Sequence, residues 1–248
     1  MSTLAGQSVL VTRYVPGSNR RQDASDETML SLGTMLARLH SLADGAGACA
    51  RPAGSWHHLS VNGGGRRSDV EILLMLLRDA ETRLADDERP PLRELRRELE
   101  KLDDLEDLPQ ALTHPDPCGA NLVAVDGDEG VLVDWTGAGR GPRVAGFAIL
   151  IGSVTALALV DAAVAGYRRH ASLEVGELER LEAALICFPL ILDCWTLLFQ
   201  GESPSTVLKL LAMRRQRAKA LADRARSAFA APGPQPGAKA EADQSTLF

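Results

Sequence analysis

Apolar residues along this chain recur mainly at intervals of three and four positions, the spacing that places side chains on one face of a helix. Between Ser25 and Leu42 this period is clear, and Ser25 is a residue type that caps helix N-termini well. The same period predicts further helices over residues 68–86, 90–104, 144–169, 177–199 and 204–229. Pro189 lies inside the segment 177–199 and should kink or interrupt that helix.

Strand-like patterns are short. Residues 8–15, SVLVTRYV, form a β-branched run that ends in a Pro-Gly turn, which predicts one strand, and no partner strand is evident upstream of it. Two apolar runs, 122–125 and 131–133, flank the sequence DGDEG, a typical hairpin connection. DGDEG also resembles part of a calcium loop, but it lacks the later acidic ligand. The predicted fold class is therefore mainly α with a small β hairpin.

The composition narrows the classes of function. Of the 248 residues 45% are hydrophobic, enough for a sizeable core, and the formal net charge is -6. We expect no nucleic-acid partner, because contacts with phosphate groups need a basic surface. The four cysteines show no metal-ligand spacing, and the first residues lack a secretory signal pattern. A cytoplasmic protein is the simplest interpretation.

Two segments bear on membranes and disorder. Residues 144–160 carry no charge, but they barely reach the length of a bilayer span and include Gly, Ser, Thr and Ala. We therefore expect a buried helix there and no membrane partner. Residues 230–248 are rich in Pro, Ala and Gly, which predicts a disordered tail.

Four polar residues surround the predicted hairpin, namely His114, Asp116, Asn121 and Asp134. Phosphoryl transfer uses one Asp to accept the proton of the acceptor hydroxyl, and an Asn and a second Asp to hold magnesium against the nucleotide phosphates. The hairpin would fold the chain back, so that Asp134 can approach Asn121. The alternative is that Asp116 and Asn121 only make turn hydrogen bonds, as Asn and Asp often do. The combined spacing favours a site.

These residues carry a resemblance to a known family. HPDPCGAN at 114–121, followed by LVAVDGDEGVLVDWTGAGRG, resembles the HGDLHPGN…IDWEGAGRG pattern of the aminoglycoside phosphotransferase and choline kinase family. VLVTRYVPG at 9–17 is similar to the hinge strand of that family, and MLARLHSL at 35–42 to the helix that follows it. The resemblance implies the helical C-terminal lobe of a protein-kinase-like phosphotransferase, residues 18–229, after a remnant N-lobe strand and hinge, residues 1–17.

The resemblance also implies roles for the residues around the hairpin. Asp116 would be the catalytic base, and His114 would buttress the catalytic loop. Asn121 and Asp134 would bind Mg. Trp135 is interpreted as a packing residue below the metal site.

Cofactor and acceptor follow from the same resemblance. The backbone of Arg13 and Val15, at the hinge, would contact the adenine of ATP, the co-substrate. A small hydroxylated acceptor, such as an aminoglycoside or another amino-alcohol or sugar, would lie between the catalytic loop and the C-terminal helices. Acidic residues such as Asp193 or Glu202 are candidates to face it.

The chain departs from the family pattern at important places. A β-rich lobe with a phosphate-covering loop and a phosphate-binding lysine should precede the hinge, yet the first lysine is Lys101. Gly146 replaces an Asp that braces the catalytic loop, and Pro115, Pro117 and Cys118 also depart from the motif or stiffen it. One interpretation is a kinase that is truncated or completed by another polypeptide, with an exposed face that could drive self-association. The other is a non-catalytic relic or binding module.

Two further motifs are interpreted as surface loops. His57-His58 could suggest a metal site, but adjacent side chains point in different directions on any regular element. GGGRR at 63–67 is rich in glycine, but it follows the hinge and is not expected to bind phosphate.

Overall fold

The structure is a computed structural model, and it describes residues 2–4, 7–9, 18–19, 25–42, 65–124, 130–135 and 138–232. Helices dominate these residues, and the strands are short, which confirms the predicted fold class. The helices are α1 Asp26–His40, α2 Gly65–Glu81, α3 Arg89–Glu100, α4 Arg143–Gly152, α5 Ala158–Tyr167, α6 Val175–Glu179, α7 Leu181–Gln200 and α8 Pro204–Ala230. A short 3-10 turn, η1, spans Gly119–Asn121.

The strands form small antiparallel sheets. β1 Ser2–Leu4 pairs with β2 Gln7–Val9, so the strand expected near the N-terminus does have an upstream partner, contrary to the prediction. β1 and β2 are close neighbours in the sequence, so the few residues before the expected strand are enough to supply its hairpin partner. β3 Ser18–Asn19 pairs with β5 Leu122–Ala124, and β5 pairs with β6 Val131–Leu132, which confirms the predicted hairpin.

A second pair of strands lies on either side of that hairpin in the sequence. β4 Gln110–Thr113 pairs with β7 Gly139–Pro142. The sequence pattern did not predict these strands, because Gly-Arg-Gly-Pro has no apolar alternation and forms a strand only against its partner. Together the two pairings hold both ends of the segment that carries the candidate site.

The helix capping follows the sequence closely. The hydroxyl of Ser25 accepts a hydrogen bond from the Thr28 backbone N–H at 3.2 Å, and Ser203 accepts one from Thr206 at 3.1 Å. These bonds satisfy backbone donors that the first turn of a helix leaves unpaired. Pro204 follows the second cap at the start of α8, where its missing N–H costs little.

Two predicted helices differ from the structure. The segment 144–169 contains a break between α4 and α5, where Arg217 of α8 donates to the backbone carbonyl of Val154. That carbonyl is thereby satisfied by a side chain from another helix. Pro189, in contrast, does not interrupt α7, which continues through it. The loss of one helical hydrogen bond there is offset by the burial of α7 between other helices.

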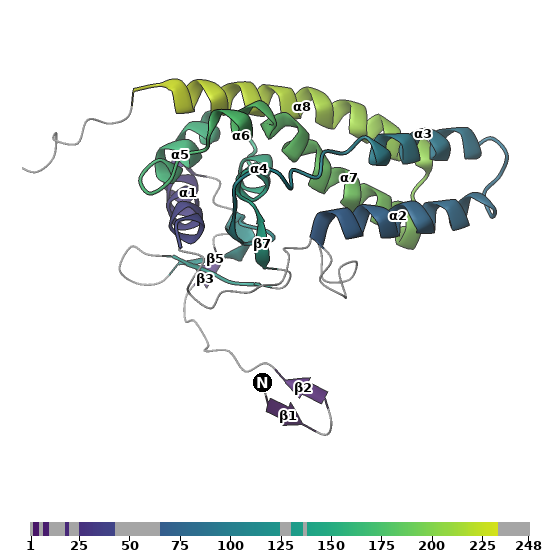
Figure 1. Cartoon of the computed structure of the whole chain (residues 1–248), viewed down its shortest axis with the longest axis horizontal. Helices are drawn as coiled ribbons and strands as arrows, with labels where there is room; N and C mark the ends of the chain where they lie inside the picture. Colours follow the sequence, from purple (N-terminus) through teal and green to yellow (C-terminus); the bar gives the residue numbers. More distant parts are fainter. Residues whose placement is uncertain are drawn as a thin grey trace, which may run out of the picture.

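In the part of the chain that the structure describes, the helices pack around two hydrophobic cores. The first core includes Leu32 of α1, Phe147 of α4 and Tyr167 of α5. The second core lies between α2, α3 and α7 and includes Leu77 and Leu95. Helices α7 and α8 contribute side chains to both cores, and Figure 1 shows α8 running along the whole helical body. The two cores are therefore joined by continuous helices.

Glycines bring α1 and α5 into backbone contact. A Cβ atom on Gly33 would lie 2.2 Å from the carbonyl oxygen of Ala163, and one on Gly166 would lie 2.1 Å from that of Leu30. Side-chain carbon atoms do not approach so closely, so only glycine fits at either position. Figure 1 shows the two helices beside each other below the end of α8.

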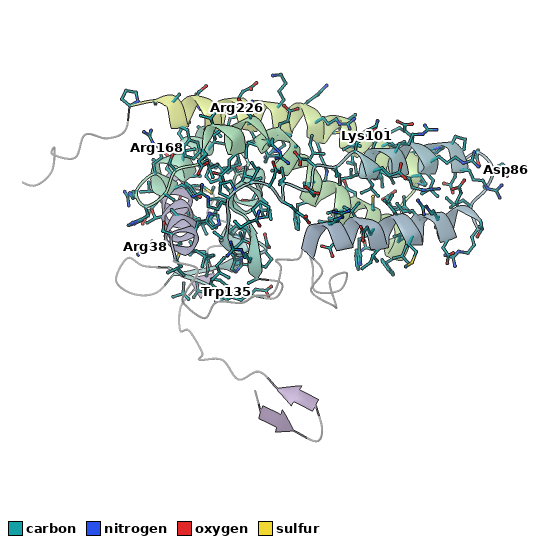
Figure 2. All side chains as sticks on the ribbon, in the orientation of Figure 1. Arg38, Asp86, Lys101, Trp135, Arg168 and Arg226 are labelled. Carbon is teal, nitrogen blue, oxygen red and sulfur yellow. The ribbon has the colours of Figure 1, made fainter. Side chains whose placement is uncertain are left out.

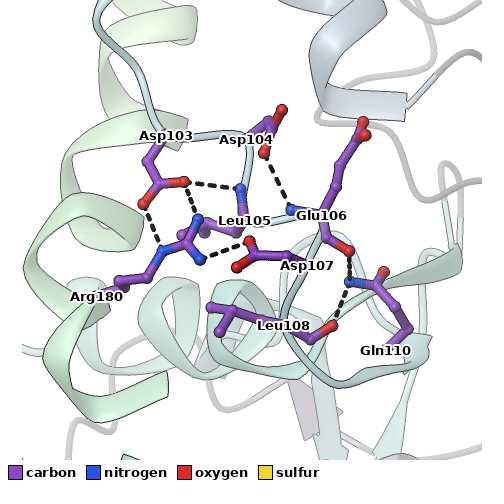
Figure 3. Close-up of polar contacts among 8 residues, drawn as sticks. All are labelled: Asp103, Asp104, Leu105, Glu106, Asp107, Leu108, Gln110 and Arg180. Atoms are coloured by element: carbon purple, nitrogen blue, oxygen red, sulfur yellow. Dashed lines mark hydrogen bonds and ion pairs between the residues drawn. The ribbon is translucent and has the colours of Figure 1, made fainter. Parts of the chain in front are cut away.

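A loop rich in acidic residues leads from α3 to β4 and so to the candidate site. Arg180, between α6 and α7, pairs with Asp103 and with Asp107, the latter at 2.5 Å (Figure 3). Asp103 also accepts the backbone N–H of Leu105 at 3.0 Å. Leu105 is fully buried and has a φ of 60°, a backbone conformation that is rare for a non-glycine residue. The ion pairs and the buried leucine fix the chain where it enters β4.

One helix in the described part of the chain, α7, is long and apolar enough to cross a membrane by length and composition. Half of its apolar window is buried inside the fold, and core helices commonly pass the same test. The uncharged segment 144–160 forms parts of α4 and α5 instead. Most of α4 is buried, as the sequence predicted.

Candidate active site

The candidate site lies on the loop that joins β4 to β5. This loop starts after Thr113 and ends in η1, and the strands at its two ends pair with β7 and β6. Thr113 also donates its hydroxyl to the Gly139 carbonyl at 3.3 Å. The position of the loop is therefore set by strands from other parts of the chain: β7 and β6, which follow it, and β3, which precedes it and also pairs with β5.

His114 is completely buried and both of its ring nitrogens have backbone partners. Nδ1 accepts the N–H of Asp116 at 3.1 Å, so it carries no proton. Nε2 lies 2.9 Å from the carbonyl oxygen of Val133, to which it must donate. Burial lowers the pKa of His114, which favours this neutral tautomer. The ring thereby links the start of the loop to the strand end before Asp134.

Asp116 is exposed at the apex of the loop and is held by Asn121. The Asn121 amide Nδ2 donates to the Asp116 carboxylate at 3.0 Å and to its backbone carbonyl at 2.9 Å. The Cys118 N–H also donates to that carbonyl, at 2.9 Å. Pro115 and Pro117 lack N–H groups and cannot donate within the loop. The bonds from Asn121 and Cys118 nevertheless give the Asp116 carbonyl its hydrogen-bond donors, and Asp116 remains exposed.

Asp134 follows the hairpin, and the residue before it forms a backbone hydrogen bond with Asn121. The N–H of Val133 donates to the carbonyl of Asn121 at 2.9 Å, so the hairpin brings the two candidate metal ligands together. Asp134 is exposed and has a φ of 60°, a conformation that Asp adopts more readily than most residues and that often marks functional sites. No described residue forms a hydrogen bond or ion pair with its carboxylate.

Trp135 packs beside this arrangement. Its indole N–H donates to the Leu132 carbonyl at 2.9 Å, and its ring meets the His114 ring edge-on, with centroids 4.8 Å apart. Figure 2 shows Trp135 at the side of the helical body that carries the short strands. The ring thus supports His114 while remaining partly exposed.

Other residues singled out in the sequence lie elsewhere. Arg13 and Val15, as well as His57 and His58, fall outside the residues that the structure describes. Asp193 is buried in α7 and pairs with Arg214 at 2.8 Å, and burial raises its pKa. Glu202 is exposed and accepts the backbone N–H of Ser203.

A pocket of about 180 Å³ adjoins Asp116. Its wall consists of residues of α4 and α7, and Arg214 of α8 also lines it. The described lining residues are Asp116, Ala148, Ile149, Gly152, Ser153, Ala184, Leu185, Phe188, Pro189, Leu192 and Arg214. The pocket lies between the catalytic loop and later helices, where the acceptor was expected, but the sequence did not indicate its apolar lining, because these apolar residues follow the same helical period as core residues.

Gly146 lies against a buried histidine rather than against the catalytic loop. A Cβ atom there would come within 3.1 Å of Nε2 of His40, which has no hydrogen-bond partner among the described residues. The other ring nitrogen of His40, Nδ1, lies 2.8 Å from the Tyr167 hydroxyl. Burial, aided by the positive charge of Arg143, lowers the pKa of His40 to about 3. His40 is therefore neutral, and no carboxylate occupies the place beside it.

Comparison with known sequences shows the family. The sequence model of the phosphotransferase enzyme family matches residues 2–184. The chain therefore belongs to this family, as the resemblance around His114 and Asp134 indicated. A comparison with curated proteins finds no match.

Solved structures share the fold. An ethanolamine kinase from Plasmodium vivax has a TM-score of 0.53 and 15% identity, over 83% of this chain and 63% of that protein. An amicoumacin kinase, in complex with AMP-PNP, Ca²⁺ and Ami, has a TM-score of 0.50 and 18% identity, with the same two coverages. These likenesses show the fold of kinase-like phosphotransferases. The chain spans about 63% of the length of either protein.

Proposed function

We propose that this protein is an ATP- and Mg-dependent phosphotransferase that phosphorylates a hydroxyl group of a small molecule. The main support is that Asn121 contacts both Asp116 and Val133, the residue before Asp134. Membership of the phosphotransferase family supports the reaction class. ATP as co-substrate follows from that membership, with adenine proposed to contact the backbone of Arg13 and Val15.

Asp116 is proposed as the general base. Its carboxylate is exposed to an approaching hydroxyl and is oriented by the Asn121 amide. It would accept the proton of the hydroxyl as the oxygen forms a bond to the γ-phosphorus of ATP, and the bond to the β-phosphate oxygen breaks to release ADP. Most of the rate gain would come from holding the reacting groups in position.

Asn121 and Asp134 fit a magnesium ion by their chemistry. With its Nδ2 turned to Asp116, Asn121 keeps its amide oxygen available, and the Asp134 carboxylate has no partner in the described structure. Magnesium commonly takes one or two protein oxygen ligands and completes its shell with phosphates and water. The described residues hold no cluster of three His, Cys, Asp or Glu ligands, which suits that arrangement rather than an all-protein cage. When bound, the ion would neutralise the phosphate charge.

His114 is proposed as a positioning residue. Both of its ring nitrogens are engaged by backbone groups, so the ring has no free nitrogen for proton transfer. It would hold the Asp116 loop at a fixed distance from the strand that ends before Asp134. A substitution such as His114→Ala should therefore lower turnover by disordering the loop rather than by removing a proton carrier.

The test compares three carboxylate-to-amide variants of the full chain. Asp116→Asn and Asp134→Asn should each lower magnesium-dependent ATP turnover by about 100- to 10,000-fold, because each removes a charge from the reacting groups. Asp161→Asn is the matched control, since Asp161 pairs with Arg224 on the surface between α5 and α8. Turnover that is absent altogether, or equal in all three variants, would overturn the proposed activity.

A non-catalytic binding module remains the alternative function. In the family, an Asp at the position of Gly146 braces the catalytic loop. The glycine supplies no such carboxylate, and the side chain next to it is His40, so Gly146 favours this alternative. Binding of small hydroxylated molecules without any magnesium-dependent turnover would support this alternative over the kinase.

A further inference from the structure

The pocket beside Asp116 is mostly apolar, a property that the HPDPCGAN motif does not predict. Among the described residues that line it, Asp116 and Arg214 are the charged ones, and the walls are otherwise mostly aliphatic or aromatic. Ile149 of α4 faces this space from one side, and Phe188 and Leu192 of α7 from the other. A ligand that reaches Asp116 through the pocket therefore contacts mainly carbon atoms.

The charge of the pocket does not suit a ligand with several ammonium groups. Recognition of such a ligand requires several carboxylates, because an unpaired charge against apolar walls is costly. Asp193 does not line the pocket: it is buried in α7, with Oδ1 paired to Arg214 and Oδ2 without a hydrogen-bond partner among the described residues. Glu202 does not line the pocket. Among the described residues that line the pocket, the carboxylate is that of Asp116, which the reaction itself would use.

The wall formed by α7 also includes a proline. Pro189 has no N–H, so it cannot donate to the carbonyl oxygen of Leu185, four residues earlier. Both residues line the pocket. A ligand hydroxyl or amide N–H can satisfy such a carbonyl, whereas a hydrocarbon surface cannot.

We propose that the acceptor is an uncharged alcohol whose hydrocarbon body fills this pocket, with its reactive hydroxyl at Asp116. This inference rests on the proposed function and narrows its substrate class, away from aminoglycosides. The cavity of about 180 Å³ is below the roughly 300–1,000 Å³ of drug-sized ligand sites. The pocket therefore takes a small alcohol, or one apolar part of a larger acceptor.

Gly152 offers a way to fill the pocket without disturbing the fold. It is an exposed residue at the end of α4, and a Cβ atom there would meet only the Leu185 side chain, at an ordinary 3.6 Å. Gly152→Leu would therefore extend into the space next to Leu185. Gly176→Leu is the matched control, because Gly176 is exposed on α6 and its nearest neighbour would be Leu108 at 4.0 Å.

The experiment measures binding to the full 248-residue chain by ligand-observed NMR. The probes are 2-phenylethanol, an uncharged alcohol with an apolar body, and kanamycin, a polycationic sugar. We expect 2-phenylethanol to bind the native chain, and Gly152→Leu to weaken this binding at least about 10-fold, the scale of a lost apolar contact in a binding pocket. Gly176→Leu should bind it like the native chain, and kanamycin binding should not depend on Gly152.

The outcomes separate this inference from the proposed function. Binding of 2-phenylethanol that depends on Gly152 supports the inference even if no variant turns over ATP, because binding requires no phosphoryl transfer. Asp116→Asn should retain this binding within about threefold while losing turnover, since the apolar walls are unchanged. Absent or Gly152-independent binding of 2-phenylethanol overturns the inference. So does kanamycin binding that Gly152→Leu abolishes, even in an active kinase.

Discussion

The first core brings helix backbones into contact, whereas the second core is filled by leucine side chains. In the first core, Gly33 and Gly166 let α1 and α5 touch, and the neutral His40 is buried beside them. In the second core, leucines such as Leu77 and Leu95 occupy the space between α2, α3 and α7. The candidate site is attached to the first core, through α4 and the β4–β7 pair. We therefore expect the first core, which supports the residues proposed for chemistry, to tolerate added volume less well than the second, more adaptable core, which supports the helices beyond them.

The largest expected effect is a backbone clash in the first core. Gly166→Ala would place a methyl group 2.1 Å from the Leu30 carbonyl oxygen, so α1 and α5 would have to separate. We expect a loss of more than about 4 kcal/mol in the free energy of unfolding, measured by chemical denaturation. Gly176→Ala, at an exposed position of α6, should fold normally. A cost below about 1 kcal/mol at Gly166 would show that the two helices separate easily.

A truncation in the second core should have the next largest effect. Leu95 is completely buried, and Leu95→Ala should lower the free energy of unfolding by about 3 kcal/mol through the cavity that it leaves. Hydrogen exchange should accelerate in α2 and α3 before it does in α1 and α5. Leu95→Met keeps most of the volume and should cost less than about 1.5 kcal/mol. Equal costs for the two variants would contradict the view of an adaptable core.

Acid should lower the stability of the protein through His40, which is buried in the first core. The pKa of His40 is lowered from 6.5 to about 3 in the folded protein, so below pH 6.5 the unfolded chain binds a proton that the folded chain does not. Its contribution to stability is fully present above pH 6.5 and is lost as the pH falls toward about 3. Between pH 7 and pH 5 this loss amounts to about 2 kcal/mol. Burial also lowers the pKa of His114, so His114 likewise contributes stability that decreases as the pH falls.

Denaturation curves at several pH values test this pH dependence. His40→Gln should flatten the decrease in stability between pH 7 and pH 5, because glutamine does not titrate. His170→Gln is the control, since His170 lies at the surface. An unchanged slope in His40→Gln would exclude His40 as its source.

The smallest expected effect is at a glycine that makes no backbone contact. Gly152→Ala adds a methyl group with ordinary contacts at the end of α4 and should raise the free energy of unfolding by up to about 1 kcal/mol. The thermal midpoint and the denaturant midpoint should both increase. Destabilisation at this position would mean that the end of α4 is as sterically constrained as the contact between α1 and α5.

The sequence predicted the helices more accurately than their ends. The Ser25 cap and the apolar spacing of α1 are local features, and α1 lies where they indicated. The break after α4 was missed; at the break Arg217, more than sixty residues away in the sequence, donates to the Val154 carbonyl, a contact that local spacing does not reveal. Strands β4 and β7 were missed for the same reason, since each is stabilised by a distant partner.

The site shows the same division. The spacing of His114, Asp116 and Asn121 predicted a loop with these residues close together, because few residues separate them. The tautomer of His114 could not be predicted, because it depends on the Val133 carbonyl across the hairpin. The positive φ of Asp134 likewise appears only in the folded chain.

By itself, the sequence determined the helical class, the hairpin, the phosphotransferase family and the residues of the HPDPCGAN loop. Those features depend on the spacing of residues that are close together in the sequence, so the sequence alone is enough to recognise them. Only the tertiary structure decided that α1 and α5 meet through glycines and that Asp116 opens onto an apolar pocket between α4 and α7. Both depend on the close approach of segments far apart in the chain, where a single methyl group decides whether two surfaces touch or leave a space.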